Sequence, residues 1–284
     1  MAAVSLARTA DLIADAVERS RAVAAFNVIT LEHAEAIVDG AVGAGEGVIL
    51  QFSQNAIRFH GGNPRPLLVA CRELADAAIV PVSLHLDHID DPALIELGIA
   101  IAADVGLSSI MIDASKLDYD GNVAATADAT RRARAAGLWV EAELGEIGGK
   151  DGAHAPGVRT DPTEAAAFVA ATGVDGLAVA VGSSHAMRDR SAAIDLELIA
   201  ALAAAVPVPL VLHGSSGVPD DALSAAAGAG IRKVNVGTAL NLAGMAALRA
   251  VLDADPALVD PRPGARASRD AMAETVARFC AVLA

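Results

Sequence analysis

Three histidines stand where hydrophobic runs of the chain end, and their type and placement suit metal chemistry. They are His88, His185 and His213. If these runs are strands of one parallel barrel, their carboxyl ends share the rim on which barrel active sites are built. A single histidine at a strand end is more often a hydrogen-bonded structural residue, but three neutral imidazoles from separate strands can form an open zinc site. The sequence therefore predicts a catalytic zinc ion held by these three histidines.

An acidic residue, Asp87, directly precedes the first of these histidines. Adjacent residues on a strand point in different directions. His88 can therefore face a metal while the Asp87 carboxylate faces a substrate and exchanges protons with it. The alternative is that Asp87 orients a metal-binding histidine through a hydrogen bond. The sequence leaves both roles open.

Two carboxylates, Glu141 and Glu143, occupy the fifth hydrophobic run with the same strand parity. A strand of a parallel barrel is buried on both faces, and buried carboxylates need partners. Lys116 or Lys233 could neutralise them, and Glu143 could also contact the metal. His85 lies deeper in the third run, where we expect it to pack inside the barrel or to support the catalytic acid.

Two loops of small residues predict a phosphate site. They follow the seventh and eighth runs and read Gly214-Ser215-Ser216-Gly217 and Asn235-Val236-Gly237-Thr238. Barrels frequently bind phosphate with the loops after these two strands, because small residues let backbone amides approach the anion. The hydroxyl groups of Ser216 and Thr238 add hydrogen-bond donors.

The hydrophobic pattern predicts the scaffold that brings these residues together. Short apolar runs alternate with Ala-rich stretches of helical periodicity, some of which open with Asp-Pro, as at Asp91-Pro92 and Asp161-Pro162. Eight such repeats favour a (β/α)8 TIM barrel, one domain over residues 1–284, over an open doubly wound sheet. No glycine-rich dinucleotide fingerprint follows the first run. The expected strands are Ala24–Ile29, Gly47–Ser53, Val80–His88, Ser108–Asp113, Leu138–Gly145, Gly176–Gly182, Pro209–Gly214 and Ile231–Gly237.

Composition limits the partners. The net charge of −14 argues against nucleic acid or an anionic membrane as a partner, although backbone amides and a metal can still hold a phosphate. The mean hydropathy of +0.46 comes mostly from alanine, and prolines interrupt the most apolar stretch, 198–212, so we expect no membrane span. We find neither a secretory signal nor a metal-type spacing of the two cysteines, which predicts a cytoplasmic protein.

Several motifs occur in a fixed order along nearly the whole chain. They are Ala25-Phe26-Asn27, Gln51-Phe52-Ser53, His85-Leu86-Asp87-His88, Met111-Ile112-Asp113-Ala114-Ser115, Glu141-Ala142-Glu143-Leu144-Gly145, the region around His185, the two small-residue loops with His213, and Asp260-Pro261-Arg262. With these motifs the chain resembles the class II, metal-dependent fructose- or tagatose-bisphosphate aldolases. The Asp-His pair, the Glu-x-Glu-Leu-Gly run and the His-Gly-x-Ser-Gly loop are specific together.

The resemblance implies reversible cleavage of a ketose 1,6-bisphosphate into dihydroxyacetone phosphate and an aldehyde. It assigns His88, His185 and His213 to zinc, with room for a monovalent cation as a second cofactor, and Asp87 to proton transfer. The residues that it implies at the dihydroxyacetone phosphate end are Ala186, Gly214, Ser215, Ser216, Asn235, Val236, Gly237 and Thr238.

The resemblance also implies a role for Arg262, which in the family can reach the second phosphate of a neighbouring subunit's substrate. We expect Arg262 in an irregular Asp-Pro-Arg-Pro-Gly segment and the protein in a homodimer or homotetramer. The chain departs from the family at Ala186, where glycine is usual, and at Ile89, where a smaller residue is common. The glycine-rich segment 145–161 is expected to form a lid, in which Asp151 is the candidate acid or base. The sequence does not distinguish a fructose from a tagatose substrate.

Three other activities fit part of the pattern. Lys116 or Lys233 as a Schiff-base nucleophile would give a metal-free aldolase. A barrel metallohydrolase would share the histidines and Asp87 but would not need two phosphate loops. A non-catalytic sugar-phosphate-binding relative would keep the pocket without turnover, which the change at Ala186 permits.

Overall fold

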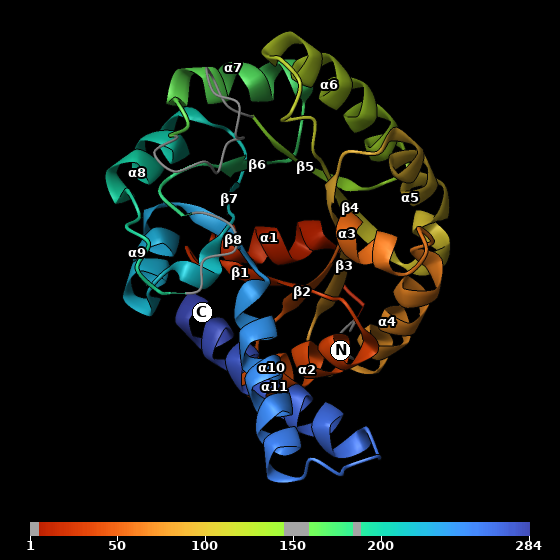
Figure 1. Ribbon diagram of the computed structural model, residues 1–284. Coiled ribbons are helices and arrows are strands. Elements are labelled where there is room, and N and C mark those ends of the chain that lie inside the picture. The colour runs from red at the N-terminus through yellow and green to blue at the C-terminus, as the bar shows by residue number, and fades with distance from the viewer. Residues whose placement is uncertain (1–5, 145–158, 184–188) are drawn as a thin grey trace.

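The computed structural model describes residues 6–144, 159–183 and 189–284. Eight parallel strands form a closed barrel, in which β1 pairs with both β2 and β8 (Figure 1). The predicted (β/α)8 architecture is confirmed. The strands are β1 (Val23–Asn27), β2 (Val48–Ser53), β3 (Val82–Ile89), β4 (Leu107–Ile112), β5 (Trp139–Glu143), β6 (Gly176–Val179), β7 (Leu210–Leu212) and β8 (Ile231–Val236).

Helices surround the barrel, and the first helix lies across its amino-terminal end, where Leu6 forms a bridge with Val82 (Figure 1). The last two long helices form a hairpin that projects away from the barrel. The helices are α1 (Thr9–Glu18), α2 (Leu31–Ala44), α3 (Gln54–Phe59), α4 (Arg65–Ala77), α5 (Pro92–Val105), α6 (Tyr119–Ala135), α7 (Pro162–Thr172), α8 (Leu196–Ala205), the short 3-10 helix η1 (Ser215–Gly217), α9 (Asp220–Ala229), α10 (Thr238–Ala254) and α11 (Arg262–Leu283).

The Asp-Pro pairs begin helices, as predicted. The Asp91 carboxylate accepts a hydrogen bond from the Ala93 amide at 2.9 Å. Asp161 accepts from the amides of Thr163 and Glu164 at 2.8 and 3.0 Å. The proline that follows each aspartate costs no hydrogen bond, because the first amides of a helix have no partner within the helix.

Several expected boundaries differ from the structure. The strand expected at Gly176–Gly182 ends at Val179. The strand expected at Pro209–Gly214 ends at Leu212, because Gly214 adopts a left-handed backbone with φ of 67° and turns the chain into η1. His213 therefore stands just beyond β7. The expectation that Arg262 lies in an irregular segment was wrong: Arg262 begins α11, and the proline after it fits the first helical turn.

The inward-facing side chains change from apolar to polar along the strands. Residues two positions apart point to the same side of a strand. In four places an apolar residue is followed in this way by a polar one: Ala25 by Asn27, Ile49 by Gln51, Trp139 by Glu141 and Val211 by His213. The apolar members belong to one buried cluster with Leu12 and Ile13 of α1. The polar members follow them along each strand and therefore lie toward the carboxyl ends of the strands.

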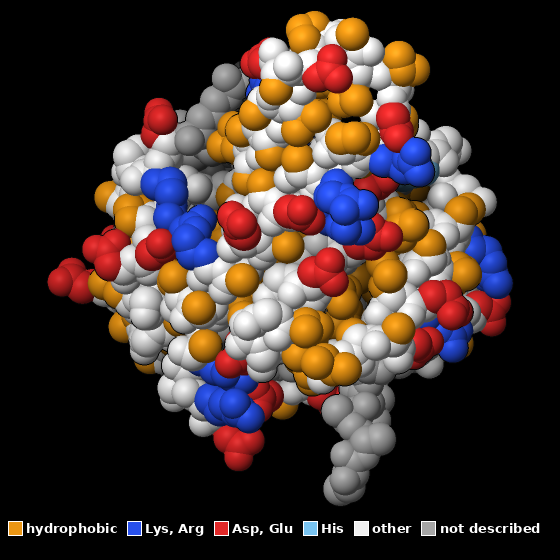
Figure 2. Space-filling model, turned by 90° about the horizontal axis from the view of Figure 1, so that it is seen from below, with side chains coloured by type: hydrophobic (Ala, Val, Ile, Leu, Met, Phe, Trp, Pro, Cys, Tyr) orange, Lys and Arg blue, Asp and Glu red, His pale blue; other side chains and the backbone are white. Residues whose placement is uncertain are grey.

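The outer surface is mixed in charge. Figure 2 shows basic side chains lying beside acidic ones on one face of the molecule. In the part of the chain that the structure describes, no helix is both long and apolar enough to cross a membrane.

Candidate active site

Two of the three predicted metal-binding histidines lie together at the carboxyl end of the barrel. Ligand atoms of His88, Glu143 and His213 all lie within 4.8 Å of one another. Imidazole nitrogen and carboxylate oxygen are the donors that zinc uses in proteins, so this set fits the predicted ion. Glu143, which the sequence left as an option, joins the cluster. His185 lies outside the described residues.

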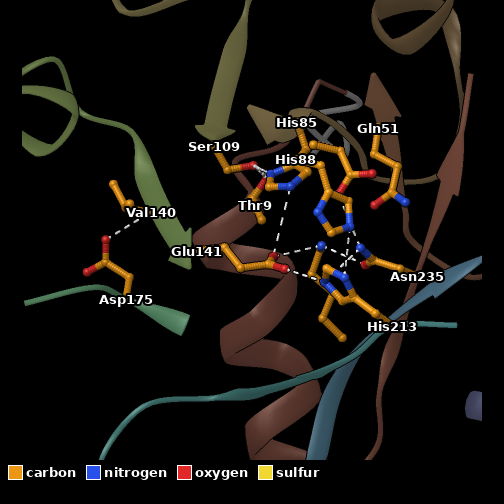
Figure 3. A network of polar contacts seen from close by, with 12 residues as sticks. Thr9, Gln51, His85, His88, Ser109, Val140, Glu141, Asp175, His213 and Asn235 are labelled. Carbon is orange, nitrogen blue, oxygen red and sulfur yellow. Dashed lines mark hydrogen bonds and ion pairs between the residues drawn. The ribbon is translucent and has the colours of Figure 1, made fainter. Parts of the chain in front are cut away.

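The His213 imidazole is oriented by a buried carboxylate (Figure 3). Its Nε2 atom lies 2.8 Å from Glu141 Oε1, and neither side chain is exposed to solvent. Its Nδ1 atom lies 3.0 Å from His88 Nε2. If Nε2 carries the proton and donates it to Glu141, the lone pair of Nδ1 faces the cluster. A hydrogen bond of this kind fixes which nitrogen a histidine offers to a metal.

Glu141 is neutralised by Lys233, one of the two lysines that the sequence offered. Lys233 Nζ lies 2.8 Å from Glu141 Oε2 and donates to Asn235 Oδ1 at 2.7 Å. The side chains of the ion pair are fully buried. Lys116 is instead exposed and pairs with Asp90 at 2.6 Å, because the turn after β4 carries it outside the barrel.

His88 is held in an unusual backbone conformation. Its φ of 51° lies in the left-handed region, which costs a residue with a side chain of this size about 1–3 kcal/mol and is found mostly at functional sites. The His88 Nδ1 atom lies 2.8 Å from Asp113 Oδ2. Asp113 is fixed in turn by the Ser115 hydroxyl, at 2.6 Å. The His88 Nε2 atom is consequently the nitrogen that faces His213.

Negative charge accumulates around His88. Burial disfavours its charged form, but the carboxylates of Asp87, Asp113 and Glu143 outweigh burial and raise the pKa of His88 to about 10. Burial likewise opposes ionisation of Asp113, yet its hydrogen bond and charge interaction with His88 hold its pKa well below the usual range. Such a surplus of carboxylates at one point is the environment that a cation stabilises.

The Asp87 carboxylate is clamped by two amides. Its Oδ2 accepts from Asn27 Nδ2 at 3.1 Å and its Oδ1 from Asn235 Nδ2 at 3.3 Å. Asn27 accepts in turn from Gln51 Nε2 at 3.0 Å. The hydrogen-bond partner of His88 is Asp113, not Asp87, so the alternative that Asp87 orients this histidine is not favoured.

A cavity of about 190 Å³ joins Asp87 and His88 to the two small-residue loops. Its lining includes six of the residues predicted at the phosphate site: Gly214, Ser215, Ser216, Asn235, Gly237 and Thr238. The Val236 side chain has the opposite parity and packs in the core between strands and helices. Ala186 lies outside the described residues.

Backbone geometry keeps the phosphate loops close to the strand ends. A side chain at Gly237 would place its Cβ atom 2.6 Å from Asn27 Oδ1, so only glycine lets the loop approach β1. Ser216 Oγ accepts from the Ala239 amide at 3.0 Å and ties η1 to the amino end of α10. A helix amino terminus favours anions.

Several cavity residues were not predicted as site residues. Asn27, Gln51 and Ser53 line the cavity, and Asp113 holds His88. The sequence did contain a signal for two of them, since Asn27 and Ser53 are polar residues at the ends of their strands. The Asp151 candidate lies outside the described residues, as does most of the expected lid.

His85 packs inside the barrel, one of its two expected roles. Its Nδ1 atom lies 2.9 Å from Ser109 Oγ, and Ser109 contacts Thr9 of α1 at 2.6 Å. Burial, followed by the charge of Lys233, lowers the pKa of His85 well below its usual value. Its Nε2 atom lies 3.9 Å from Glu141 Oε2, so His85 contacts Ser109 and Glu141.

Comparison with known proteins agrees with this geometry. The family model described as fructose-bisphosphate aldolase class-II matches residues 7–284. A fructose-bisphosphate aldolase of Staphylococcus aureus strain Mu50 is 34% identical over 269 residues, 94% of this chain and 93% of the relative. That of Geobacillus stearothermophilus is 35% identical over 276 residues, 96% and 95% of the two chains.

A solved structure extends the similarity to three dimensions. The YdjI aldolase from Escherichia coli K12 superimposes with a TM-score of 0.83 at 31% identity, covering 96% of this chain and 95% of that one. From the family match over nearly all of its length and these relatives, the chain belongs to the class II fructose-bisphosphate aldolase family.

Proposed function

We propose that this chain is a zinc-dependent aldolase that reversibly cleaves a ketose 1,6-bisphosphate, of the fructose or tagatose type, into dihydroxyacetone phosphate and an aldehyde. One observation carries the proposal: His88, which belongs to the cluster with Glu143 and His213, lines the same cavity as the clamped carboxylate of Asp87 and the two phosphate-type loops. The proposal treats residues 1–284 as one domain.

The metal-binding residues in this proposal are His88 through Nε2 and His213 through Nδ1, with His185 as the third histidine and Glu143 as a further ligand. Bound there, zinc supplies the positive charge that stabilises negative charge developing on the substrate's oxygen atoms. Glu141 and Asp113 accept hydrogen bonds from the two described imidazoles and so orient them for the ion. A monovalent cation is a second proposed cofactor.

Asp87 is the proposed acid and base. Amide donors hold both of its oxygens, and the carboxylate can take the proton of the C4 hydroxyl during cleavage and return it during condensation. The loop serines and Thr238 bind and orient the phosphate of the three-carbon fragment, with Ala186 beside them. Asp151 is the proposed acid or base for that fragment.

The lysine mechanism has little support from the geometry. Lys233 is fully buried, pairs with Glu141 and Asn235, and is not among the residues that line the cavity. Lys116 is exposed and pairs with Asp90. A Schiff-base nucleophile needs a neutral amine that can reach the substrate, and neither lysine meets both needs.

The decisive experiment gives zinc-loaded protein fructose and tagatose 1,6-bisphosphate and measures triose phosphates. We expect cleavage of at least one sugar, loss of activity with a chelator, and recovery with zinc. Borohydride should trap no lysine adduct. Release of inorganic phosphate in place of triose phosphates would favour the metallohydrolase. Binding of a sugar bisphosphate without its cleavage would favour the non-catalytic relative.

We further propose a cytoplasmic homodimer or homotetramer. Helix α10 leaves three large apolar side chains exposed, Leu242, Met245 and Leu252, whereas each other helix of the described residues leaves at most one. The α10–α11 hairpin projects away from the barrel, where a second subunit could pack against it (Figure 1). Arg262 begins α11, is exposed, and pairs with Asp260 at 2.6 Å. In the proposed oligomer the second phosphate of a neighbour's substrate competes with Asp260 for this guanidinium.

A further inference from the structure

Arg190 connects two segments that border the candidate active site. It belongs to the stretch 189–195 that leads from β6 into α8. Its Nε and Nη2 atoms both donate to the Val218 carbonyl, at 3.0 and 2.5 Å, and Nη2 also lies 2.5 Å from Asp220 Oδ1. A planar guanidinium can satisfy these acceptors together, whereas a lysine ammonium cannot reproduce the fork.

The carbonyl that Arg190 holds ends the loop that carries the candidate phosphate residues. Val218 follows η1, and residues 214–216 of this loop line the cavity. A second hydrogen bond joins the same two segments, in which the amide of Ala192 donates to Gly217 O at 3.0 Å. The stretch 189–195 therefore forms a brace against the end of the loop that begins at His213.

The brace is anchored to the last helix of the chain. Asp220 Oδ1 accepts hydrogen bonds from both Arg190 and Arg278. Arg278 belongs to α11, and its Nη1 atom lies 2.6 Å from this oxygen. Both guanidinium groups also lie over the buried ring of Phe279, at 5.8 and 4.5 Å. The hydrogen bond from Arg190 is the largest of the contacts that lower the pKa of Asp220, so the anchor is ionised at neutral pH.

We propose that Arg190 is a positioning residue that fixes the loop 213–218 in the conformation that binds phosphate and presents His213 to the metal. Its two donors hold the far end of the loop, while Glu141 holds the near end through His213. This inference rests on the proposed function for the phosphate role of the loop. It adds a residue that does not line the cavity and that neither the sequence motifs nor the family match assigns.

Three variants test the proposal: Arg190→Ala, Arg190→Lys and, as the matched control, Arg278→Gln. The control removes the other cation from Asp220 but leaves both donors on the Val218 carbonyl. Calorimetry would measure the affinity for inorganic phosphate, and chelator competition the affinity for zinc. Thermal unfolding would report stability alongside.

We expect Arg190→Ala to weaken both affinities about tenfold, within the range found for residues that act through a neighbour. Arg190→Lys should keep the ion pair with Asp220, and hence most of the thermal stability, yet still lose phosphate affinity. Arg278→Gln should lower stability without changing either affinity. In turnover, the Arg190 variants should raise KM more than they lower kcat.

Two results would overturn the proposal while the aldolase assignment stands: wild-type affinities in Arg190→Lys and Arg190→Ala, or equal losses in Arg278→Gln. Failure of the proposed function has a different signature, since the wild-type protein itself would then bind no phosphate or cleave no sugar.

Discussion

His213 Nε2 and Glu141 Oε1 lie 2.8 Å apart with both side chains fully buried, so one carboxylate inside the barrel decides which imidazole nitrogen faces the metal cluster. Glu141 can serve in this way because Lys233 neutralises it. The choice of the metal-binding nitrogen on His213, just after β7, thus depends on charges carried by β5 and β8.

Glu141→Gln is expected to lower zinc affinity about 10–100-fold, the usual cost of losing such a supporting group. It should also lower the free energy of unfolding by about 3–5 kcal/mol, because Lys233 is left buried without its counter-charge. Chelator competition and urea denaturation measure the two effects. The double variant with Lys233→Met should regain stability but not zinc affinity. Full zinc affinity in Glu141→Gln would refute the orienting role.

His213→Ala should abolish zinc-dependent turnover and leave the barrel folded, since His213 stands beyond the end of β7. Metal analysis after dialysis and circular dichroism would check the two parts. One equivalent of tightly held zinc with near-normal activity would exclude His213 from the metal site.

Asp87→Ala is expected to lower turnover about 10²–10⁴-fold, the contribution of a positioned acid or base. Zinc should still bind, because Asp113 and not Asp87 contacts the His88 imidazole. Steady-state kinetics with parallel metal analysis provides the test. If the variant also lost zinc, Asp87 would have to be assigned to support of the metal site.

Arg262→Ala should raise the KM for a ketose bisphosphate while hardly changing the affinity for dihydroxyacetone phosphate, which lacks the second phosphate. Light scattering should show the oligomer intact. Asp260→Ala is a useful companion, because it frees the guanidinium from its partner in the same chain and should not raise the KM. Unchanged kinetics in Arg262→Ala, or a fully active monomer, would show that this arginine does not bridge subunits.

The two thiols are expected to be unreactive in the folded protein. Burial raises the pKa of Cys71 and of Cys280 to about 12, so at pH 8 both stay protonated and shielded from reagents. An aromatic disulfide reagent should therefore titrate both groups only after denaturation. Rapid reaction of either thiol at pH 8 would show that its helix opens locally.

The barrel could be predicted because its strands are buried on both faces and appear in the sequence as continuous apolar runs. His88, Asp87 and the two loops were recognisable because polar residues end such runs. The sequence could not decide whether Lys233 or Lys116 is the partner of Glu141, because the answer depends on the strand register from β5 to β8. The role of Asp113 was hidden for a similar reason, since its contact with His88 depends on the left-handed backbone at that histidine.

The pairing of β1 with β8 ties the order of folding to the order of synthesis. Strand β1 leaves the ribosome early, but its second neighbour is the last strand to emerge. The backbone amide of Ala22 likewise donates to the carbonyl of Leu283 in the final helix, so this hydrogen bond forms only after the last residues are synthesised. Contacts so far apart in sequence form slowly, and until they form both edges of the nascent sheet stay open to other chains. A growing chain that lacks β8 is therefore the species that a chaperone would need to protect.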